Sequence, residues 1–304
     1  MSNAIIAIDK SRSYRVYMAV TTPLVQEAAD IHHTTPVTTA ALGRVVTGAG
    51  LMGIMSKNSQ DKLTVDFKGD GPARQILATA YGDGRVKALI ANPYVDLPLN
   101  SDGKLDVGGS LGIGNLTVIK DIGLKEPYVG TIALVDGEIA DDLTAYFYIS
   151  EQQNTSVALG VKVERDLSVG AAGGMIIQLL PDAQEGVVDA LEAMIAELDP
   201  MTTIISRVGE KSAGLSAEGL LEAVMADAFS AMPDEFKPET LEYRDIRWEC
   251  DCSRERIEAA LSTIGRDDLQ EIIEEDGQAE LQCHFCLKKY DFNREELTAI
   301  LERM

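Results

Sequence analysis

The only four cysteines of this 304-residue chain lie in two short motifs, Cys250-Asp251-Cys252 and Cys283-His284-Phe285-Cys286. A C-x-C and a C-x-x-C motif about thirty residues apart can place four thiolates around one Zn²⁺, which prefers tetrahedral sulfur coordination. The sequence therefore predicts a zinc site with the ligands Cys250, Cys252, Cys283 and Cys286. Because four cysteines already satisfy the metal, we interpret His284 as a knuckle residue and not as a ligand.

Two interpretations of this cluster are open. In the first, the four thiolates hold a permanent structural zinc ion, as most four-cysteine sites do. In the second, the cluster is a redox switch, because zinc-bound thiolates remain nucleophilic and an oxidant can convert one of them to a sulfenic acid. Each motif contains a second thiol that could resolve this acid to a disulfide.

The C-x-C spacing sets the two interpretations apart. Residues two positions apart in an extended chain have Cα atoms about 7 Å apart, at the edge of disulfide reach. A bridge between Cys250 and Cys252 therefore needs a bent backbone, and we expect its formation to expel the metal. The cysteine region has about sixty residues and a thin core, and zinc contributes on the order of 10 kcal/mol to such units. Loss of zinc should unfold it.

Other chemical motifs are weaker. The glycines of Gly48-Ala49-Gly50-Leu51-Met52-Gly53 match G-x-G-x-x-G, but they lie late in an apolar helical stretch instead of following a strand. We therefore expect them to allow close helix packing and not to bind a dinucleotide. No serine or cysteine motif lies near His32 and His33, so a catalytic triad is poorly supported and a solvated helix end is favoured.

Charge and hydropathy limit the partners and the compartment. The formal net charge is −22, and no strongly basic stretch is present, which disfavours nucleic-acid binding. The first nine residues lack a secretory signal pattern. The most apolar stretch, 37–55, contains Thr38, Thr39, Arg44 and Thr47 and predicts a buried helix, not a membrane span. We expect a cytoplasmic protein without nucleic-acid or membrane partners, in which clustered cysteines bind metal or do thiol chemistry.

The order of elements predicts an α+β fold with a mixed N-terminal sheet domain. Strands of one sheet are expected over 14–20, 62–68, 74–81, 85–91, 116–120, 128–135, 156–164 and 173–180. Helices are expected over 22–33, 37–55 and 139–152, the first with Thr22 as its N-cap, and 100–114 is expected to be a loop.

After Pro181 the pattern becomes helical, with apolar faces over 187–198 and, following Ser216, over 220–228. Pro233 and Pro238 then mark a boundary. The predicted domains are a core at 1–181, a helical linker at 182–237 and a small C-terminal four-cysteine zinc domain at 238–304. In the last domain we expect helices over 253–261 and 267–274, a hairpin of 278–282 with 287–292, and a final helix capped by Asn293 and Glu296.

Several motifs together resemble one known family. They are Cys250-Asp251-Cys252-Ser253-Arg254-Glu255-Arg256, Glu275-Asp276-Gly277 and the second cysteine pair with Tyr290 and Phe292, preceded in order by Phe67-Lys68-Gly69-Asp70-Gly71-Pro72, Asn92-Pro93, Val95-Asp96-Leu97-Pro98, Ser150-Glu151-Gln152 and Gly173-Gly174-Met175 with Gln178 and Pro181. In this order they resemble the redox-regulated chaperones of the thirty-three-kilodalton heat-shock protein family.

The resemblance implies an ATP-independent holdase of the bacterial cytoplasm and not an enzyme. It implies that the reduced, inactive form binds Zn²⁺ through all four cysteines. Oxidation would form the disulfides Cys250–Cys252 and Cys283–Cys286, release the zinc and disorder the C-terminal domain and the linker. An active homodimer would then hold unfolding client proteins.

Two functions of other classes remain as alternatives. A constitutive structural zinc-ribbon interaction module would keep its zinc in oxidant. A thiol–disulfide oxidoreductase using Cys283 and Cys286 would normally have its C-x-x-C at a helix N-terminus, whereas here a hairpin turn is predicted. The apolar faces of the linker helices are candidates for client contact or for masking by the zinc domain, and ordinary helix packing is an equal alternative.

Overall fold

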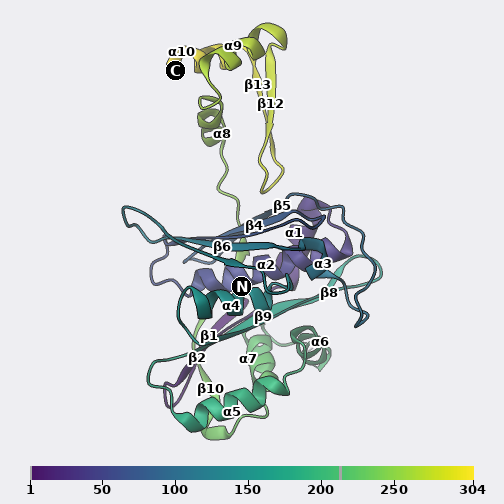
Figure 1. Ribbon diagram of the computed structural model, residues 1–304, viewed down its shortest axis with the longest axis vertical. Coiled ribbons are helices and arrows are strands. Elements are labelled where there is room, and N and C mark those ends of the chain that lie inside the picture. The colour runs from purple at the N-terminus through teal and green to yellow at the C-terminus, as the bar shows by residue number, and fades with distance from the viewer. Residues whose placement is uncertain (1, 212–213) are drawn as a thin grey trace. The chain divides into compact units, whose positions relative to one another are not determined.

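The computed structural model describes residues 2–211 and 214–304 and has the predicted α+β class (Figure 1). The chain divides into two compact units, of which the first ends at Trp248 and the second comprises Glu249–Met304. The first unit contains two sheets, so the expectation of a single sheet was wrong. The second unit contains a two-stranded hairpin and three helices.

The larger sheet has the strand order β11-β5-β4-β3-β6-β7. Its strands are β3 (Lys62–Gly69), β4 (Gln75–Tyr81), β5 (Arg85–Ile90), β6 (Gly114–Asp121), β7 (Tyr128–Ala133) and β11 (Arg247–Trp248). All neighbours are antiparallel except β11, which runs parallel to β5. The predicted meander of β3, β4 and β5 is confirmed, and the alternation of buried Leu63, Val65 and Phe67 gives this sheet its inner face.

The second sheet is fully antiparallel, with the order β10-β1-β2-β9-β8. Its strands are β1 (Ala4–Asp9), β2 (Tyr14–Val20), β8 (Thr155–Val163), β9 (Val169–Leu179) and β10 (Pro238–Arg244). Strand β1 was not predicted from the sequence. Both of its faces are covered, because Ile6 faces one hydrophobic core and Ile5 faces the other.

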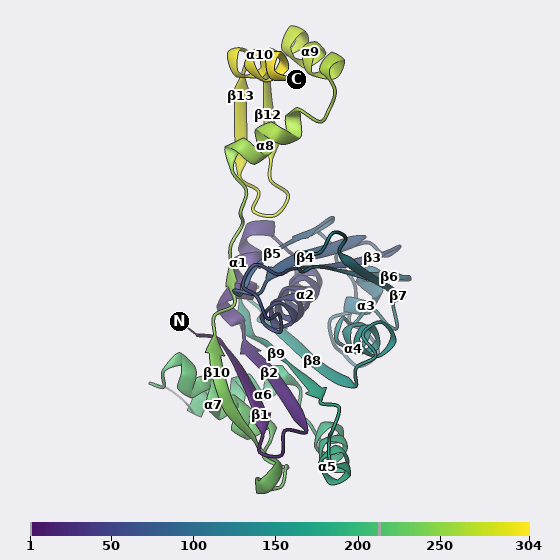
Figure 2. The ribbon, with the colours of Figure 1, turned by 90° about the vertical axis from the view of Figure 1, so that its left-hand side faces the viewer.

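Helix α2 (Pro36–Ile54) lies between the two sheets (Figure 2). It is long and apolar enough to cross a membrane, but 94% of its apolar window is buried inside the protein, as the prediction of a buried helix required. The G-x-G-x-x-G motif lies within this helix and serves close packing: a Cβ on Gly50 would come within 2.6 Å of the Ile246 side chain. The other helices of this layer are α1 (Thr22–His32), α3 (Val107–Leu111) and α4 (Ala140–Ile149).

Three local expectations for this layer were wrong. The predicted loop at 100–114 contains α3, whose N-cap Asp106 accepts a hydrogen bond from the Gly109 backbone N–H. The N-cap of α1 is Thr21, and the Thr22 hydroxyl accepts a hydrogen bond from the Ala172 N–H at 2.9 Å. The solvated helix end expected for His32 and His33 holds for the exposed His33, whereas His32 is buried, with its Nε2 3.0 Å from the Ala88 carbonyl oxygen.

Helices α5 (Glu185–Ala196), α6 (Met201–Lys211) and α7 (Ala217–Ala228) cover the other face of the second sheet (Figure 1). Helix α6 was not predicted, whereas the capping of α7 by Ser216 is confirmed. The apolar residues Val187, Leu191 and Val224 are buried in the core beneath these helices. Of the alternatives for the linker faces, the structure therefore shows ordinary helix packing within the first unit.

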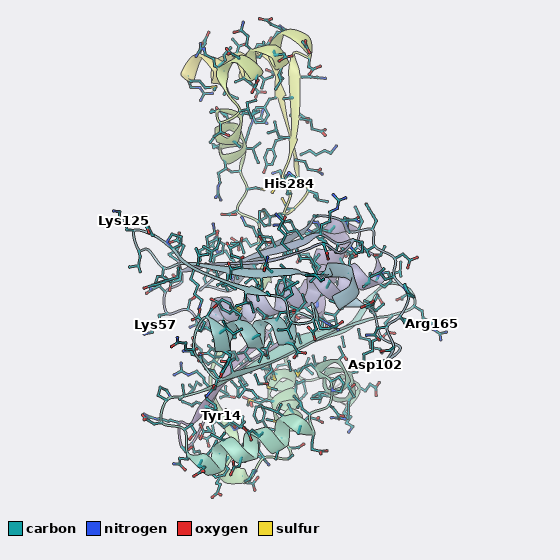
Figure 3. The ribbon with its side chains drawn as sticks, in the orientation of Figure 1. Tyr14, Lys57, Asp102, Lys125, Arg165 and His284 are labelled. Atoms are coloured by element: carbon teal, nitrogen blue, oxygen red, sulfur yellow. The ribbon has the colours of Figure 1, made fainter. Side chains whose placement is uncertain are left out.

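Tyr14 anchors this helical layer to strand β2 (Figure 3). Its ring stacks on Phe229 with the centroids 6.1 Å apart, and its hydroxyl donates to the Phe236 carbonyl oxygen at 2.6 Å. Phe236 ends the 3₁₀ helix η1 (Asp234–Phe236), which leads into β10. Burial raises the pKa of the Tyr14 phenol, so this hydrogen-bond donor stays protonated.

Residues 238–248, expected in the C-terminal domain, make their contacts in the first unit. Strand β10 pairs with β1 along Pro238–Arg244. The Asn3 side chain accepts a hydrogen bond from the Ile246 N–H and donates one to its carbonyl oxygen, both at 2.7 Å. The three-domain division remains a prediction, but compact packing places this segment with the sheets.

The second unit consists of α8 (Arg254–Leu261), α9 (Arg266–Glu275), β12 (Gln278–Gln282), β13 (Lys289–Asn293) and α10 (Arg294–Arg303). These elements confirm the sequence prediction. The predicted cap of the last helix is also present: the Asn293 side chain accepts from the Glu296 N–H at 2.9 Å, and Glu296 accepts from the Asn293 N–H at 3.0 Å. The buried core is small, and its residues are Leu261, Leu269, Ile273, Cys283, Tyr290, Phe292, Leu297 and Ile300.

Candidate metal centre

The structure brings all four cysteines together. Cys250 and Cys252 come from the segment before α8, and Cys283 and Cys286 come from the loop between β12 and β13. Their sulfur atoms all lie within 4.8 Å of one another, with Cys250 Sγ 3.7 Å from Cys283 Sγ and Cys252 Sγ 3.3 Å from Cys286 Sγ. All four are free thiols.

These sulfur positions suit one tetrahedral metal ion. A Zn–S bond of about 2.3 Å places neighbouring sulfurs of a regular tetrahedron about 3.8 Å apart. The two sulfur–sulfur distances of 3.7 and 3.3 Å are close to this value. The donor set is sulfur only, which favours a thiophilic ion such as Zn²⁺ over hard cations that select oxygen ligands. The site can therefore hold a metal ion.

A tight turn positions the second cysteine pair. The Cys283 N–H donates to the Lys288 carbonyl oxygen at 3.0 Å, and the Leu287 N–H donates to the Cys283 carbonyl oxygen at 2.8 Å. Leu287 adopts a left-handed backbone with φ of 55°, which closes the knuckle. His284 is exposed on this loop and does not belong to the metal-binding group (Figure 3). The predicted hairpin turn is confirmed.

The first pair is held by the start of α8. Ser253 caps this helix by accepting a hydrogen bond from the Arg256 N–H at 3.3 Å. The Arg254 guanidinium donates to the Asp291 carbonyl oxygen and to a Glu296 carboxylate oxygen, both at 2.7 Å. It also lies 4.4 Å above the Phe292 ring. Arg254 thus ties the C-x-C segment to the hairpin that carries the other two cysteines.

Tyr290 supplies a contact at the sulfurs that sequence reasoning did not assign. Its hydroxyl lies 3.2 Å from Cys252 Sγ, and its side chain is buried on the inner side of β13. Burial alone would raise the pKa of the Cys252 thiol, but hydrogen bonds from Tyr290 and the neighbouring thiols lower this pKa to about 7. The alternation of buried Tyr290 and Phe292 along β13 is the sequence signal that could have indicated an inward-facing hydroxyl.

Two of the other thiols, Cys250 and Cys286, are harder to ionise than an ordinary cysteine. Burial raises the pKa of both Cys250 and Cys286, although the backbone N–H groups of Cys252 and Lys288 donate to these two sulfurs and act in the opposite direction. A bound divalent cation reverses this burial effect, because it stabilises thiolates directly. Without a cation the site therefore disfavours thiolates at Cys250 and Cys286, and a bound metal ion would stabilise them.

Comparisons with known proteins agree over the whole chain. The family model described as Hsp33 protein matches residues 2–293. A 33 kDa chaperonin of Alkaliphilus oremlandii is 44% identical over 302 residues, which cover 99% of this chain and 96% of that protein. A 33 kDa chaperonin of Clostridium botulinum (strain 657) is 43% identical over 297 residues, covering 97% and 96%.

Comparison of the fold with solved structures points to the same family. The crystal structure of a 33 kDa chaperonin, a heat shock protein 33 homologue from Thermotoga maritima, matches with a TM-score of 0.84 and 32% sequence identity, covering 100% of this chain and 99% of that one. Sequence, fold and the four-cysteine cluster therefore agree, and the chain belongs to the Hsp33 family of chaperones.

Proposed function

We propose that this protein is a redox-regulated, ATP-independent holdase and not an enzyme. In this proposal it acts in the cytoplasm, its reduced form is inactive with Zn²⁺ at the four cysteines, and oxidation activates it to hold unfolding clients as a homodimer. The observation that carries the proposal is the convergence of all four thiols of the chain within 4.8 Å in a unit with a small core.

The chemistry requires a two-electron oxidant for each disulfide. When the oxidant is hydrogen peroxide, a thiolate attacks it to give a sulfenic acid and hydroxide, which takes up a proton to form water. The second thiol of the motif then attacks that sulfur, expels a second water and forms the disulfide. The proposed pairs are Cys250–Cys252 and Cys283–Cys286. Two disulfides remove all four thiolate ligands, so the site no longer holds Zn²⁺.

Loss of the metal has a structural consequence because Cys283 is itself a core residue. It is 7% exposed and packs with Leu269, Tyr290 and Phe292. Structural zinc contributes on the order of 10 kcal/mol in small metallo-domains, more than a core of this size supplies alone. We therefore expect residues 249–304 to unfold when the thiols are oxidised, and this unfolding to be the step that activates the chaperone.

Zinc and client binding together test the proposal. The reduced full-length protein is treated with hydrogen peroxide at mildly elevated temperature, and released zinc, free thiols and aggregation of a thermally unfolding enzyme are measured. We expect zinc release, loss of four thiols and suppression of aggregation to occur together. Retention of zinc in oxidant would favour the constitutive zinc-ribbon module, and zinc release without client protection would reject the holdase assignment.

A further inference from the structure

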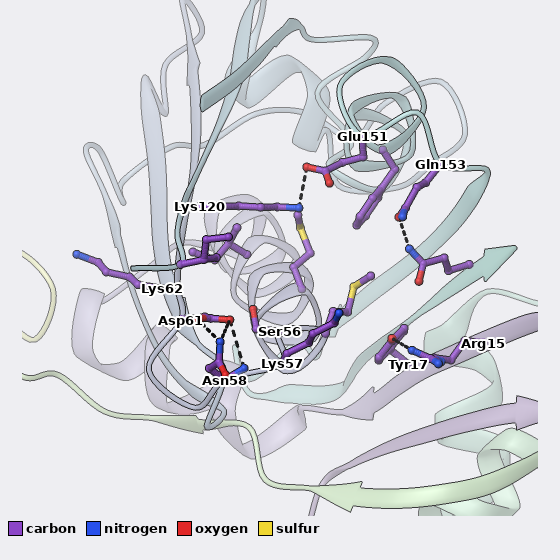
Figure 4. A pocket seen from close by; sticks show the side chains of 16 residues that line it. Arg15, Tyr17, Ser56, Lys57, Asn58, Asp61, Lys62, Lys120, Glu151 and Gln153 are labelled. Carbon is purple, nitrogen blue, oxygen red and sulfur yellow. Dashed lines mark hydrogen bonds and ion pairs between the residues drawn. The ribbon is translucent and has the colours of Figure 1, made fainter. Parts of the chain in front are cut away.

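A cavity of about 490 Å³ lies in the first unit beside the C-terminal end of α2, and it shares no residue with the cysteine site (Figure 4). Side chains from β2, β3, β6 and β9, from α4 and its C-terminal flank, and from the turn after α2 form its walls. Protein cavities that bind small molecules measure about 300–1,000 Å³. The cavity therefore has the size of a small-molecule site.

One part of the wall is apolar. It is formed by Tyr17, Met52, Met55, Leu63 and Phe147. Tyr17, Met52 and Phe147 are almost fully buried, so their positions are fixed by packing in the protein core. Methionine and aromatic side chains accommodate flat or irregular apolar groups. This surface suits the hydrocarbon part of a ligand.

The two carboxylates of the cavity are already engaged. Glu151 accepts from the Lys120 ammonium at 2.7 Å and from the Tyr146 hydroxyl at 2.5 Å. Although burial alone would raise the pKa of Glu151, these two donors hold it below its ordinary value. Asp61 accepts from the Asn58 backbone N–H at 3.2 Å and from its side-chain amide. Neither carboxylate neutralises the other cations of the cavity.

Three cationic side chains that line the cavity, those of Arg15, Lys57 and Lys62, remain without a counter-charge among the described residues. Among the residues that the structure describes, neither Arg15 nor Lys57 forms an ion pair. Within the described part of the chain, the Arg15 Nε is buried without a hydrogen-bond partner, and the guanidinium donates to the Tyr17 hydroxyl alone, at 3.4 Å. A buried donor without an acceptor is costly, and a guanidinium matches the paired oxygens of a phosphate or carboxylate. Lys62 also lines the cavity, but its ammonium points away from the other labelled side chains in Figure 4.

We propose that this cavity binds a small organic anion, with its phosphate or carboxylate group at Arg15 and Lys57 and its apolar body against Met52, Met55 and Phe147. Unpaired cations in a cavity are unusual for a chain with a net charge of −22, whose overall electrostatic field repels anions. The unpaired cations of the cavity make this site locally positive, which would favour a negatively charged ligand. The proposal concerns the first unit alone and is independent of the redox switch.

Calorimetric titration of the reduced, zinc-loaded full-length protein tests this site. The probes are phenyl phosphate, benzoate, inorganic phosphate and the uncharged benzyl alcohol. We expect saturable binding of an aryl anion that exceeds both inorganic phosphate and benzyl alcohol; the stronger of the two aryl probes identifies the head group. Absence of saturable binding by both aryl anions up to about 10 mM would overturn the proposal, since fragments of this size reach millimolar affinity.

Matched variants locate the binding. Arg15→Met and Lys57→Gln should each weaken binding of the aryl anion at least tenfold. Lys125→Gln makes the same charge change at an exposed loop residue (Figure 3) that does not line the cavity, and it should not weaken binding. Without ligand, Arg15→Met should melt no lower than the parent chain, because it removes a buried unpartnered donor. Lys57 is exposed, so its variant remains informative even if Arg15→Met does not fold. Equal affinity in Lys57→Gln and Lys125→Gln would contradict the assignment.

Discussion

The Tyr290 hydroxyl lies 3.2 Å from Cys252 Sγ, which joins the core of the second unit directly to a proposed metal ligand. Tyr290 is nearly buried and belongs to the same small core as Cys283. Groups that hydrogen-bond to metal ligands change metal affinity by about 10–100-fold. We therefore expect the phenol hydroxyl to increase the affinity of the site for its metal ion, while the ring contributes to the core.

The variant Tyr290→Phe separates these two contributions. It keeps the ring and removes the hydrogen bond to Cys252, so we expect about tenfold weaker zinc binding with little loss of folded structure in the metal-bound form. Competition with a chromogenic chelator measures the affinity. Tyr94→Phe, at a side chain that is 68% exposed, is the control. Unchanged zinc affinity in Tyr290→Phe would show that the hydroxyl does not act on the site.

The lowered pKa of Cys252 predicts which thiol reacts first when the metal is removed. Immediately after chelation, while residues 249–304 are still folded, the Cys252 thiolate of the reduced protein forms as the pH rises through about 7, whereas burial raises the pKa of Cys250 and Cys286. Alkylation should therefore begin at Cys252 near neutral pH and slow as the pH falls below 7, because the thiolate is the reactive form. Peptide mass mapping of briefly alkylated protein measures the order. Prior labelling of Cys250 would contradict the electrostatic account.

Removal of zinc from the reduced protein should unfold only the second unit. Its core contains few fully buried side chains, whereas the first unit has two large cores on either side of a five-stranded sheet. We expect amides of α8, α9 and α10 to lose hydrogen-exchange protection after chelation, while those of β1, β2 and β9 keep it. The same chelator saturated with zinc is the control. Full protection of α8–α10 without metal would show that zinc is not needed for folding.

Substitution of Ile246 provides a test of whether the segment before the cysteines belongs to the first or to the second unit. It is 1% exposed, and it packs where a Cβ on Gly50 would come within 2.6 Å. Ile246→Ala should destabilise the first unit by about 2–4 kcal/mol, because truncation leaves a cavity in a packed core. Zinc affinity should stay the same. A variant that loses zinc affinity but keeps the melting temperature of the first unit would place the segment functionally with the second.

Sequence reasoning predicted the four-cysteine cluster because it depends on residue type and spacing. Cys250 precedes helix α8, whose start Ser253 caps, and Cys283 follows strand β12, so signals near each motif in the sequence indicated where both pairs lie. It did not predict the contact of Tyr290 with Cys252, which depends on the three-dimensional approach of the hairpin to the C-x-C segment.

Prediction of the fold from the sequence was limited in the same way, by contacts between distant segments of the chain. Strand β1 has a continuous apolar run because both its faces are buried, so it lacks the alternation that identifies strands such as β3. The helical period of α5 and α7 predicted their apolar faces correctly but could not show that the second sheet covers them. His32 looked like a solvated helix end because nothing nearby in the sequence indicates the Ala88 carbonyl that meets it.

The central claim is that oxidation of the four thiols, by releasing zinc, switches on client binding. The most direct measurement is an oxidant titration in which released zinc, remaining thiols and suppression of client aggregation are followed in the same samples. We predict that all three change over the same range of oxidant and reverse when a dithiol and zinc are restored. Client protection by the reduced, zinc-bound protein equal to that of the oxidised protein, or protection that appears while zinc stays bound, would contradict this account.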